Sequence, residues 1–368
     1  MRAGSLATGL LTVLGLAAGF AVQPAAAATT HAIASTNLGY TPLASPTRIA
    51  DTRSGATDPS TYAGNTLCSG CSRTVDLPGL PSGAGAVVGQ LTAINPTTAG
   101  YLAAYPTTVS GNPAPTANVV FTKGQTVGNL VTVAVGTDPS NGDPAIDIYN
   151  GPSGGTVDFT FDLYGYYGGP SQTSSLAYNA ITPFRLLDTR STGSALGPGS
   201  TINIPVTGVG TIPSGAGAVV LNIAVTNTTA SSYIQCYPTG SPPSAGSPTV
   251  NQNWVAGETL STQVILGVGS GGSVTCMNAA GGTDLIADAD GYYSTTGDLL
   301  NALSTPTRLL DTRPSGVSPG ASVSVAVQGS GATAGVLNIT DIAGGPNYLT
   351  AYPSGSSVPT AANVNYTT

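Results

Sequence analysis

Short apolar and β-branched runs alternate along most of the chain with clusters of glycine, proline, asparagine and serine. The runs are about five to nine residues long, a pattern that predicts β-strands separated by turns. After a strand that contains Arg-Leu-Leu-Asp at 185–188, we expect further strands with the sequences TINIPV, AVVLNIAVTN, SYIQCYP, VNQNWV, STQVILGV, GSVTCMN and DLIADADGYY. No convincing helical period is present, so the pattern argues against crossover helices and a parallel α/β sheet.

One octapeptide marks the start of three copies of this pattern. It occurs, with small changes, as PTRIADTR, TPFRLLDTR and PTRLLDTR at 46–53, 182–190 and 306–313. Further matches follow in the same order: PSGAGAVV occurs twice, and YLAAYP returns as YIQCYP and YLTAYP. The first two copies close alike, with DFTFDLYGYY and DLIADADGYY. Such self-similarity indicates tandem modules.

About eight antiparallel strands in a module of about 120 residues fit a Greek-key or jelly-roll β-sandwich better than a propeller, whose blades repeat at roughly 40 to 50 residues. We therefore predict an all-β chain of tandem antiparallel β-sandwich modules. The predicted organisation is a signal peptide at 1–28, repeat 1 at 35–168, repeat 2 at 175–294 and a truncated repeat 3 at 299–368.

The third copy stops before the segment that completes the other two. Its last residues, NVNYTT at 363–368, align with NVVFTK at 118–123, after which repeat 1 continues to its GYY strand. We expect the sequence to be part of a longer protein; the alternative is that another chain supplies the lacking strands. Open central edges would otherwise expose unpaired backbone groups and favour aggregation.

The first 28 residues have the layout of a secretory signal peptide. Met1-Arg2 gives a positive start, 6–22 is mostly apolar, and 24–28 offers small residues for cleavage. We therefore expect a secreted protein, extracellular or associated with the cell surface, that begins near Ala28 or Thr29. A retained transmembrane helix is the alternative, but Gly and Thr interrupt the apolar stretch, and no later run is apolar enough to span a bilayer.

Composition narrows the class of protein. Charged residues make up 7% of the chain, against about 25% in ordinary soluble domains. Hydrophobic residues reach 40%, so the chain is able to bury cores and is not of the disordered type. A net charge of -7 and a single lysine, Lys123, argue against nucleic acid as a partner, because phosphate binding needs clustered Lys and Arg.

Several motifs in fixed order carry a resemblance: the P-x-R-L-L-D-T-R opening, the SGAxAVVLN strand, the YLxxYP strand and the terminal D-x-x-GYY. Together they resemble a tandem module of actinobacterial secreted and surface proteins, over residues 40–368. The resemblance implies extracellular repeat proteins and no established activity. Repeat 1 departs from the pattern at Ala50, where the module has Leu, and by its CSGC insertion.

Six of the nine basic residues stand in the octapeptides. Each copy has Arg-x-x-Asp-x-Arg, and the complete repeats add an aspartate in their last strand; the residues are Arg48, Asp51, Arg53 and Asp162, then Arg185, Asp188, Arg190 and Asp288, then Arg308, Asp311 and Arg313. If first and last strands are neighbours, an arginine–aspartate pair ties the ends of a module together, and the aspartate of D-T-R caps the next turn. We favour this structural role over a repeated site for an anionic or sugar ligand, since both arginines flank an apolar dipeptide.

Four cysteines, two in each of the first two repeats, suit an oxidising compartment. We predict disulfides Cys236–Cys276, between two strands of repeat 2, and Cys68–Cys71, within a loop of repeat 1. A thioredoxin-like redox pair at CSGC is the alternative, but it needs a helix N-terminus to activate the thiol, and this stretch is rich in Gly, Ser and Thr. Zinc would need two further ligands.

No catalytic constellation stands out. The sole histidine, His31, lies beside the expected new N-terminus, which disfavours a Ser-His-Asp or Cys-His site. A carboxylate pair for glycoside hydrolysis stays open, because aspartates are plentiful. Repeated domains rarely each carry a catalytic site, however, and we predict a protein that is not an enzyme and has no cofactor.

Two further features of the sequence are candidate ligand-binding sites, a loop for calcium and a set of aromatic residues for sugars. The loop GTDPSNGDPAID offers oxygen donors of the kind that Ca²⁺ prefers, but it lacks EF-hand spacing and has no counterpart in repeat 2, so we favour a solvated turn; its donors are Asp138, Asn141, Asp143 and Asp147. Trp254 and the tyrosines of YLAAYP, YIQCYP and GYY suit a sugar-stacking platform, although aromatics at strand positions belong more often to the core.

These observations predict a secreted, non-enzymatic repeat protein of a cell envelope or extracellular matrix, which acts as an adhesive, a spacer or a surface component. An extracellular polysaccharide or a cell-wall polymer is the expected partner. The alternative is an array of carbohydrate-binding modules, once attached to a hydrolase domain.

Overall fold

The computed structural model describes residues 33–57, 59, 61–107, 116–152, 154–169, 175–245, 248–304, 306–327, 331–342, 347–359 and 361–366. The predicted signal peptide and His31 lie outside the described residues. Contacts divide the chain into a larger unit, His31–Thr307 with Thr333–Thr368, and a smaller one, Met1–Thr30 with Arg308–Ala332. Repeats 1 and 2 therefore lie within the larger unit, together with parts of repeat 3.

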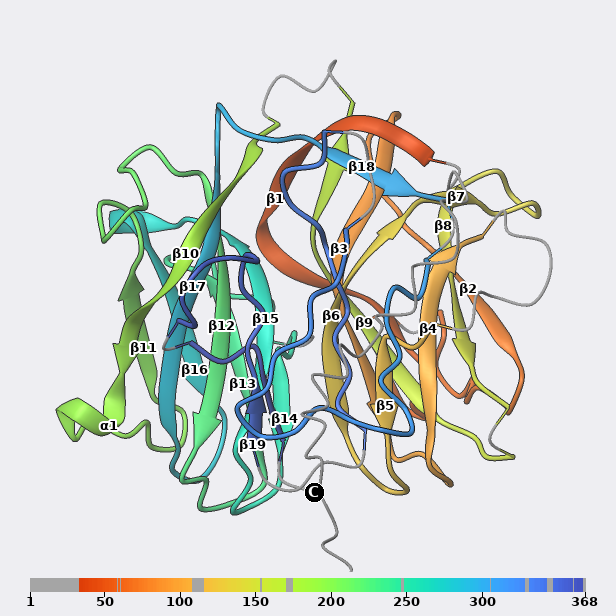
Figure 1. Ribbon diagram of the computed structural model, residues 1–368. Coiled ribbons are helices and arrows are strands. Elements are labelled where there is room, and N and C mark those ends of the chain that lie inside the picture. Colours follow the sequence, from red (N-terminus) through yellow and green to blue (C-terminus); the bar gives the residue numbers. More distant parts are fainter. Residues whose placement is uncertain are drawn as a thin grey trace, which may run out of the picture. The chain divides into compact units, whose positions relative to one another are not determined.

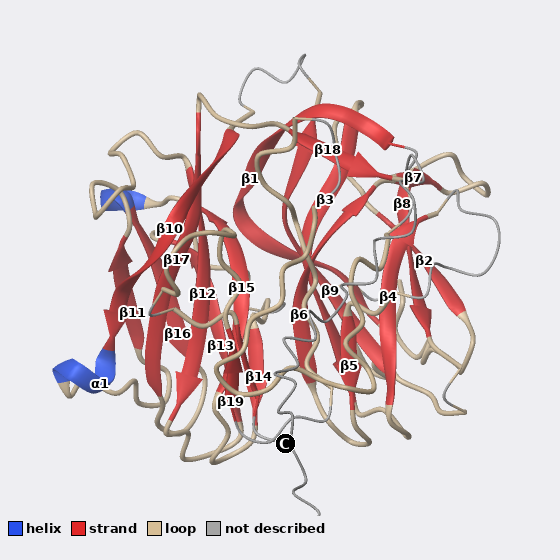
Figure 2. Cartoon of the chain, viewed as in Figure 1, coloured by secondary structure: helices blue, strands red, loops and turns tan. Residues whose placement is uncertain are grey.

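Nearly all regular structure is β, which confirms the predicted fold class (Figures 1 and 2). The strands of repeat 1 are β1 (Ile33–Asp51), β2 (Ser72–Asp76), β3 (Ala84–Ile94), β4 (Gly100–Pro106), β5 (Val119–Phe121), β6 (Val127–Ala134), β7 (Gly136–Thr137), β8 (Pro144–Asn150) and β9 (Asp158–Gly168).

Repeat 2 contains every strand that the sequence pattern predicts for it, with two short helical turns. Its elements are β10 (Ala177–Asp188), α1 (Thr189–Thr192), β11 (Thr201–Pro205), β12 (Ala218–Thr226), β13 (Ser232–Pro238), β14 (Gln252–Trp254), β15 (Leu260–Gly267), η1 (Ser270–Gly272), β16 (Ser273–Asn278) and β17 (Asp284–Ser294). In repeat 3 the described strands are β18 (Leu300–Leu303), β19 (Asn347–Leu349) and β20 (Val364–Tyr366).

Each complete repeat is a sandwich of two antiparallel sheets with the same strand order (Figure 1). In repeat 1 the sheets run β1-β9-β3-β6 and β2-β8-β4-β5, with β18 beside β1 and β7 beside β8. In repeat 2 they run β10-β17-β12-β15 and β11-β16-β13-β14. Successive strands mostly alternate between the two sheets, and the first strand pairs with the last, which is the jelly-roll arrangement. We call the sheet with the first and last strands the terminal sheet.

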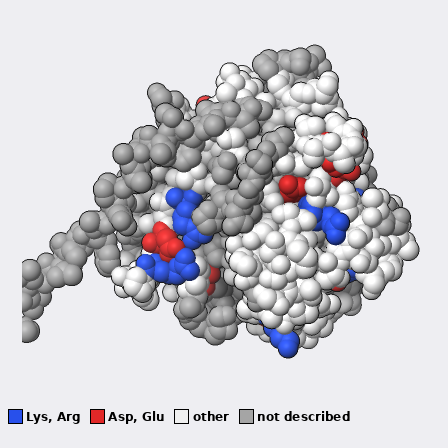
Figure 3. All heavy atoms as spheres, turned by 90° about the vertical axis from the view of Figure 1, so that its right-hand side faces the viewer, with Lys and Arg blue, Asp and Glu red and all other residues white. Residues whose placement is uncertain are grey.

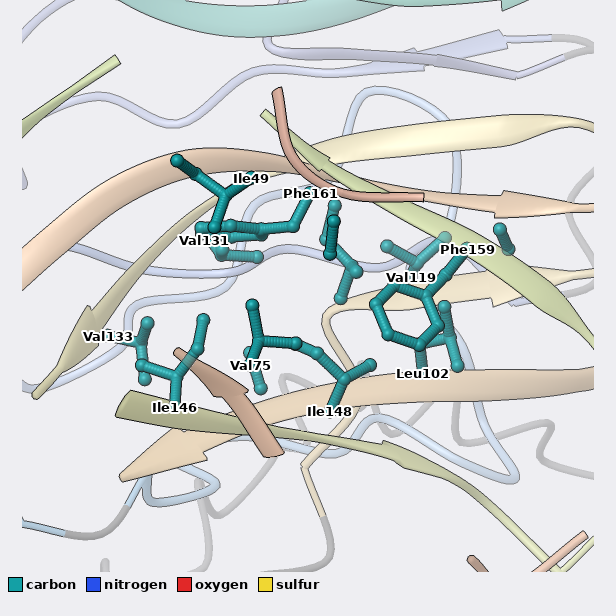
Figure 4. Close-up of a cluster of buried hydrophobic side chains, with 14 of the residues drawn as sticks. Ile49, Val75, Leu102, Val119, Val131, Val133, Ile146, Ile148, Phe159 and Phe161 are labelled. Atoms are coloured by element: carbon teal, nitrogen blue, oxygen red, sulfur yellow. The ribbon is translucent and has the colours of Figure 1, made fainter. Parts of the chain in front are cut away.

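The core of repeat 1 lies between its two sheets (Figure 4). Phe159 and Phe161 point inward from β9 and meet Ile146 and Ile148 of β8, and all are fully buried. Side chains two residues apart reach the same core because a strand alternates its faces. Burial of each such side chain stabilises the fold by about 1.5–3 kcal/mol. Repeat 2 has an equivalent core, which contains Trp254.

The outer face of each terminal sheet is buried as well. Strand β12 is buried along its whole length, whereas an antiparallel strand with one face in water alternates between buried and exposed positions. A cluster drawn from both repeats covers these outer faces; it includes Tyr40, Val88, Tyr167, Val220 and Tyr293. The terminal sheets are therefore buried between the repeats as well as within them.

A close ring contact explains the glycine of each GYY strand. The Tyr40 ring lies over Gly165 so closely that a Cβ added there would be 2.5 Å from its hydroxyl. Tyr178 lies over Gly291 in the same way, again at 2.5 Å. Any side chain at either glycine would displace the ring, so the glycines permit the tyrosines of the first strand to pack flat on the last.

Both predicted disulfides are present. Cys236 on β13 and Cys276 on β16 are directly opposite in the strand register and fully buried. Cys68 and Cys71 close a turn ahead of β2, in which the Cys71 N–H donates to the Cys68 carbonyl at 3.2 Å. The CSGC segment therefore lies in a turn rather than at the start of a helix.

We expect the double variant Cys236→Ala/Cys276→Ala to lose about 2–4 kcal/mol of unfolding free energy, because the bridge restrains the unfolded chain between strands 40 residues apart. Urea denaturation measures the loss. The control, Cys68→Ala/Cys71→Ala, opens a bridge of sequence separation 3 and should lose less. A larger loss from the control would contradict the prediction.

Candidate functional site

The arginine motif sets three polar side chains in one row across each terminal sheet. In repeat 1, Arg48 on β1 is opposite Asp162 on β9, and Asp162 is opposite Gln90 on β3. The same positions in repeat 2 hold Arg185, Asp288 and Asn222. The predicted pairing between the ends of each complete repeat is therefore confirmed.

Arg48 is held by two carboxylates. Its Nε and Nη2 atoms donate to the two oxygens of Asp162 at 2.7 and 3.1 Å, and its Nη1 atom donates to Asp51 at 3.5 Å. The side chain of Arg48 is 6% exposed and that of Asp162 is 0% exposed. A bidentate pair this deeply buried is costly to break, because the loss of one partner leaves the other charge uncompensated.

The aspartate of D-T-R caps the turn that follows it, as predicted. Asp51 Oδ1 accepts hydrogen bonds from the backbone N–H of Arg53 at 3.1 Å and from its Nε at 2.9 Å. The same two contacts, of the same lengths, join Asp188 to Arg190 and Asp311 to Arg313. The second arginine of the motif is therefore bound to its own aspartate in every copy.

These contacts change the acidity of the aspartates. The Arg190 guanidinium holds the pKa of Asp188 at about 2. Hydrogen bonds from Arg313 likewise hold the pKa of Asp311 below its usual range. Burial raises the pKa of Asp162, while Arg48 and a backbone N–H donor oppose that rise. Asp188 and Asp311 are therefore charged at neutral pH.

Repeat 2 has the same pair in a more open setting. Arg185 donates to the two oxygens of Asp288 at 2.7 and 3.3 Å and to Asp188 at 3.0 Å. Its side chain is 34% exposed, against 6% for Arg48. Water therefore screens this pair more than the pair of repeat 1.

A segment of repeat 2 covers the pair of repeat 1. The Val250 N–H donates to Asp162 Oδ2 at 2.9 Å, and Gln90 Nε2 donates to the Asn251 carbonyl at 2.7 Å. Tyr164 extends the contact: its hydroxyl accepts from Asn251 Nδ2 at 2.8 Å, and its ring lies in the core cluster of repeat 2. The cluster is therefore part of a contact between repeats.

In repeat 2 the corresponding surface holds a pocket of about 370 Å³. Its lining includes Arg185, Arg190 and Asn222 from repeat 2, and Tyr348 and Asn365 from repeat 3. The two arginines are paired with two aspartates, so the cluster brings no net positive charge to the pocket. This balance suits a neutral polar ligand better than an anion.

Asp290 stands in repeat 2 where Tyr164 stands in repeat 1, two residues after the paired aspartate. Both of its carboxylate oxygens are shielded from solvent. Burial, helped by the nearby charge of Asp288, raises the pKa of Asp290 to about 7, and the Gln263 amide only partly opposes this. Asp290 therefore loses its proton near neutral pH.

The candidate calcium ligands make hydrogen bonds in local turns and on a strand. Asp138 accepts from the Ser140 N–H at 2.7 Å, and Asn141 accepts from the Asp143 N–H at 2.8 Å, so both close local turns. Asp147 lies on β8 and accepts from Thr74 at 2.8 Å. Across the described part of the chain, no three His, Cys, Asp or Glu side chains are grouped so that they could hold a metal ion.

Trp254 and the last tyrosine of each GYY strand belong to the interior. Trp254 is 3% exposed and donates through Nε1 to the Ala230 carbonyl at 3.1 Å. Tyr167 and Tyr293 are buried, and their hydroxyls are 2.5 Å apart. Tyr348 is 58% exposed at the pocket of repeat 2.

Sequence reasoning missed the amides that stand beside the arginine pairs. Gln90 and Asn222 are both at most 2% exposed, although each interrupts a run of apolar residues. The signal was available, because the two amides occupy matching places in AVVGQLTAIN and AVVLNIAVTN. A polar residue repeated inside a buried strand indicates a required hydrogen bond.

No family model matches the chain, and no curated protein shows significant similarity to it.

We expect Arg48→Ala and Asp162→Asn each to lower the free energy of unfolding by about 3 kcal/mol, because each leaves a buried charge or dipole without its partner. The double variant should lose less than the sum, since residues in contact are coupled. Urea denaturation measures all three. Additive losses would contradict a direct pair.

Two other arginines of the motif provide a comparison for the loss expected at Arg48. Arg185→Ala removes a partly exposed partner and should cost about 1 kcal/mol, and Arg53→Ala, whose side chain is 48% exposed, should cost less than about 1 kcal/mol. Equal losses at Arg48 and Arg53 would show that burial does not decide the cost.

The elevated pKa of Asp290 makes its contribution depend on pH. A carboxyl that holds its proton more tightly when folded favours the folded state below the unfolded pKa, about 3.9. That advantage is lost as pH rises toward 7. Asp290→Asn should therefore be stabilising at pH 8, by up to about 4 kcal/mol, and close to neutral at pH 4. Melting temperatures at the two pH values test this, and a gain that is equal at both would contradict it.

Proposed function

We propose that this chain is an extracellular, non-enzymatic repeat protein that serves as a spacer, adhesive or surface component of a cell envelope or matrix. The observation that carries the proposal is the burial of the Arg48–Asp162 pair: side chains that are 6% and 0% exposed are used by the fold and are not accessible to a ligand. In repeat 1 the first arginine of the motif thus has a structural role.

The disulfides agree with an extracellular setting. Two disulfides stand in repeats 1 and 2, as in proteins of oxidising compartments. Among the described residues, no helix has both the length and the apolar character that a membrane crossing requires. On the face drawn in Figure 3, charged side chains form small groups of both signs on a largely uncharged surface. Such a surface depends little on long-range electrostatic attraction for its contacts.

The chemistry of the clusters also favours a structural role over catalysis. Each arginine of the first two motifs is engaged by at least one aspartate at hydrogen-bond distance. Asp290, whose pKa burial raises to about 7, has both carboxylate oxygens shielded from solvent, so that it does not face a substrate. A general acid must reach the group that it protonates.

A second candidate function is carbohydrate binding at the pocket of repeat 2. It is favoured by one observation: an exposed tyrosine, Tyr348, lines that pocket with Asn222, Asn365 and a charge-balanced arginine cluster. An aromatic face with convergent amides is a common way to hold a sugar ring. In repeat 1 the equivalent surface is covered by Val250 of repeat 2, so the site would be confined to repeat 2.

One experiment separates the two functions. The full chain is secreted from a Gram-positive host, and its binding to a glycan array and to isolated cell walls is compared with that of Tyr348→Ala, with Tyr233→Ala as a control aromatic elsewhere in repeat 2. The proposed function predicts wall or matrix association that Tyr348→Ala leaves unchanged. Glycan binding that only Tyr348→Ala abolishes, at an unchanged melting temperature, would replace the structural proposal by the carbohydrate site.

A further inference from the structure

The amides beside the two arginine pairs reach out of their own repeats. Gln90 Nε2 in repeat 1 donates to the Asn251 carbonyl of repeat 2 at 2.7 Å. Asn222 Nδ2, in the same register position of repeat 2, donates to the Ala362 carbonyl of repeat 3. Each amide therefore binds the backbone of the repeat that follows it in the chain.

The acceptors belong to one recurring element. It is a dipeptide that ends in asparagine, and we call it the docking dipeptide: Ala117-Asn118, Val250-Asn251 and Ala362-Asn363. Its asparagine is fixed inside its own repeat, because Oδ1 accepts a backbone N–H at 2.8, 2.5 and 2.7 Å, from Ala104, Cys236 and Ala351. The dipeptide is thus held rigidly and presents its outward carbonyls to a neighbouring repeat.

Repeat 3 carries the third amide. Asn338 stands in AGVLN, where Asn222 stands in AVVLN. Its Nδ2 atom donates to the Ala117 carbonyl of repeat 1 at 2.5 Å, and its Oδ1 atom accepts from Asn129 of repeat 1 at 2.6 Å. The same amide thus meets the same docking dipeptide a third time, and this contact runs from the last repeat back to the first.

The first strands of the repeats are joined in the same cyclic order. Tyr40 of repeat 1 exchanges two backbone hydrogen bonds of 2.7 Å with Leu176, just ahead of β10. Tyr178 of repeat 2 exchanges two of 2.8 Å with Asp298, just ahead of β18. Strand β18 then pairs with β1, which returns to repeat 1. One buried cluster at this junction contains Tyr40, Tyr167, Tyr293 and Ala302, so all three repeats contribute to it.

We infer that three consecutive repeats close into a ring, in which each repeat binds the docking dipeptide of the next and the third binds that of the first. The partner for which each of these surfaces is built is another copy of the same repeat. A head-to-tail contact of this kind either closes or continues as an open filament, and the Asn338 to Ala117 contact closes it. Because the repeats are tethered in one chain, closure is intramolecular and small contacts suffice.

The ring predicts proximity between residues 221 positions apart in the sequence. In the full chain, Ala117→Cys/Asn338→Cys should be linked by a short bismaleimide into a product of monomer mass, identified by mass spectrometry of the joined peptides. The described cysteines are all in disulfides, so that they do not compete for the reagent.

The matched negative control is Ala117→Cys/Val358→Cys. Val358 is also an exposed residue of repeat 3, but its neighbour Pro359 lines the pocket on repeat 2. This pair should stay unlinked or link far less than the pair at Asn338. Equal linking of the two pairs, or linking of Ala117 to Asn338 only between chains, would overturn the closed ring.

Calorimetry of the unmodified chain tests the ring even if a cysteine variant does not fold. Calorimetry should show repeats 1 and 2 melting in one cooperative transition, because each helps to cover the other. Separate transitions for the two repeats would contradict the ring.

The variant Asn338→Ala gives a further test. A lowered melting temperature, with faster hydrogen exchange at β5 of repeat 1, would support the ring, and unchanged exchange at β5 would count against it.

Discussion

A guanidinium that has been withdrawn from water must keep its carboxylate, and the rest of this structure is arranged around that requirement. Arg48 and Asp162 stand opposite each other on the first and last strands of repeat 1, so the charge pair can form only when these two strands lie side by side. The pair does not need to add much net stability to be effective, because its loss is penalised far more than its presence is rewarded. We therefore expect the pair to act mainly against alternative strand arrangements, in which the two residues would be buried apart.

The same requirement connects one repeat with the next. A bidentate arginine uses both oxygens of Asp162, yet the carboxylate keeps further lone pairs, and the Val250 N–H of repeat 2 takes one of them. The amide of Gln90 completes the row and binds the adjoining carbonyl. On an isolated sheet water would bind the Asp162 carboxylate and the amide nitrogens of Gln90 and Asn222. Here these atoms bind backbone of the adjoining repeat, and this helps to explain how both faces of β12 and most of β9 can be buried.

Much of the fold was readable from the sequence, for identifiable reasons. Strand positions followed from short apolar runs between turn residues, and the internal repetition aligned Arg185 with Arg48 and Asp288 with Asp162, so that the pair could be predicted. The difference in burial between the two pairs could not be predicted. It arises because Val250 covers one pair and a pocket lies over the other, and no local pattern encodes contacts between segments 88 residues apart. The amides were missed because a single Gln or Asn in an apolar run has no meaning until the neighbouring repeat is in place.

The exchange of Tyr164 for Asp290 has an evolutionary consequence. Tyr164 belongs to repeat 1 but contributes its ring to the core of repeat 2, whereas a carboxyl occupies the same place in repeat 2. Repeats that began as duplicates have thus come to differ in the side chains that they present to their neighbours. Recombination that deleted or reordered the repeats would place a carboxyl where the core of the neighbouring repeat contains an aromatic ring. Divergence of this kind makes a tandem array resistant to the loss or shuffling of units to which identical copies are prone.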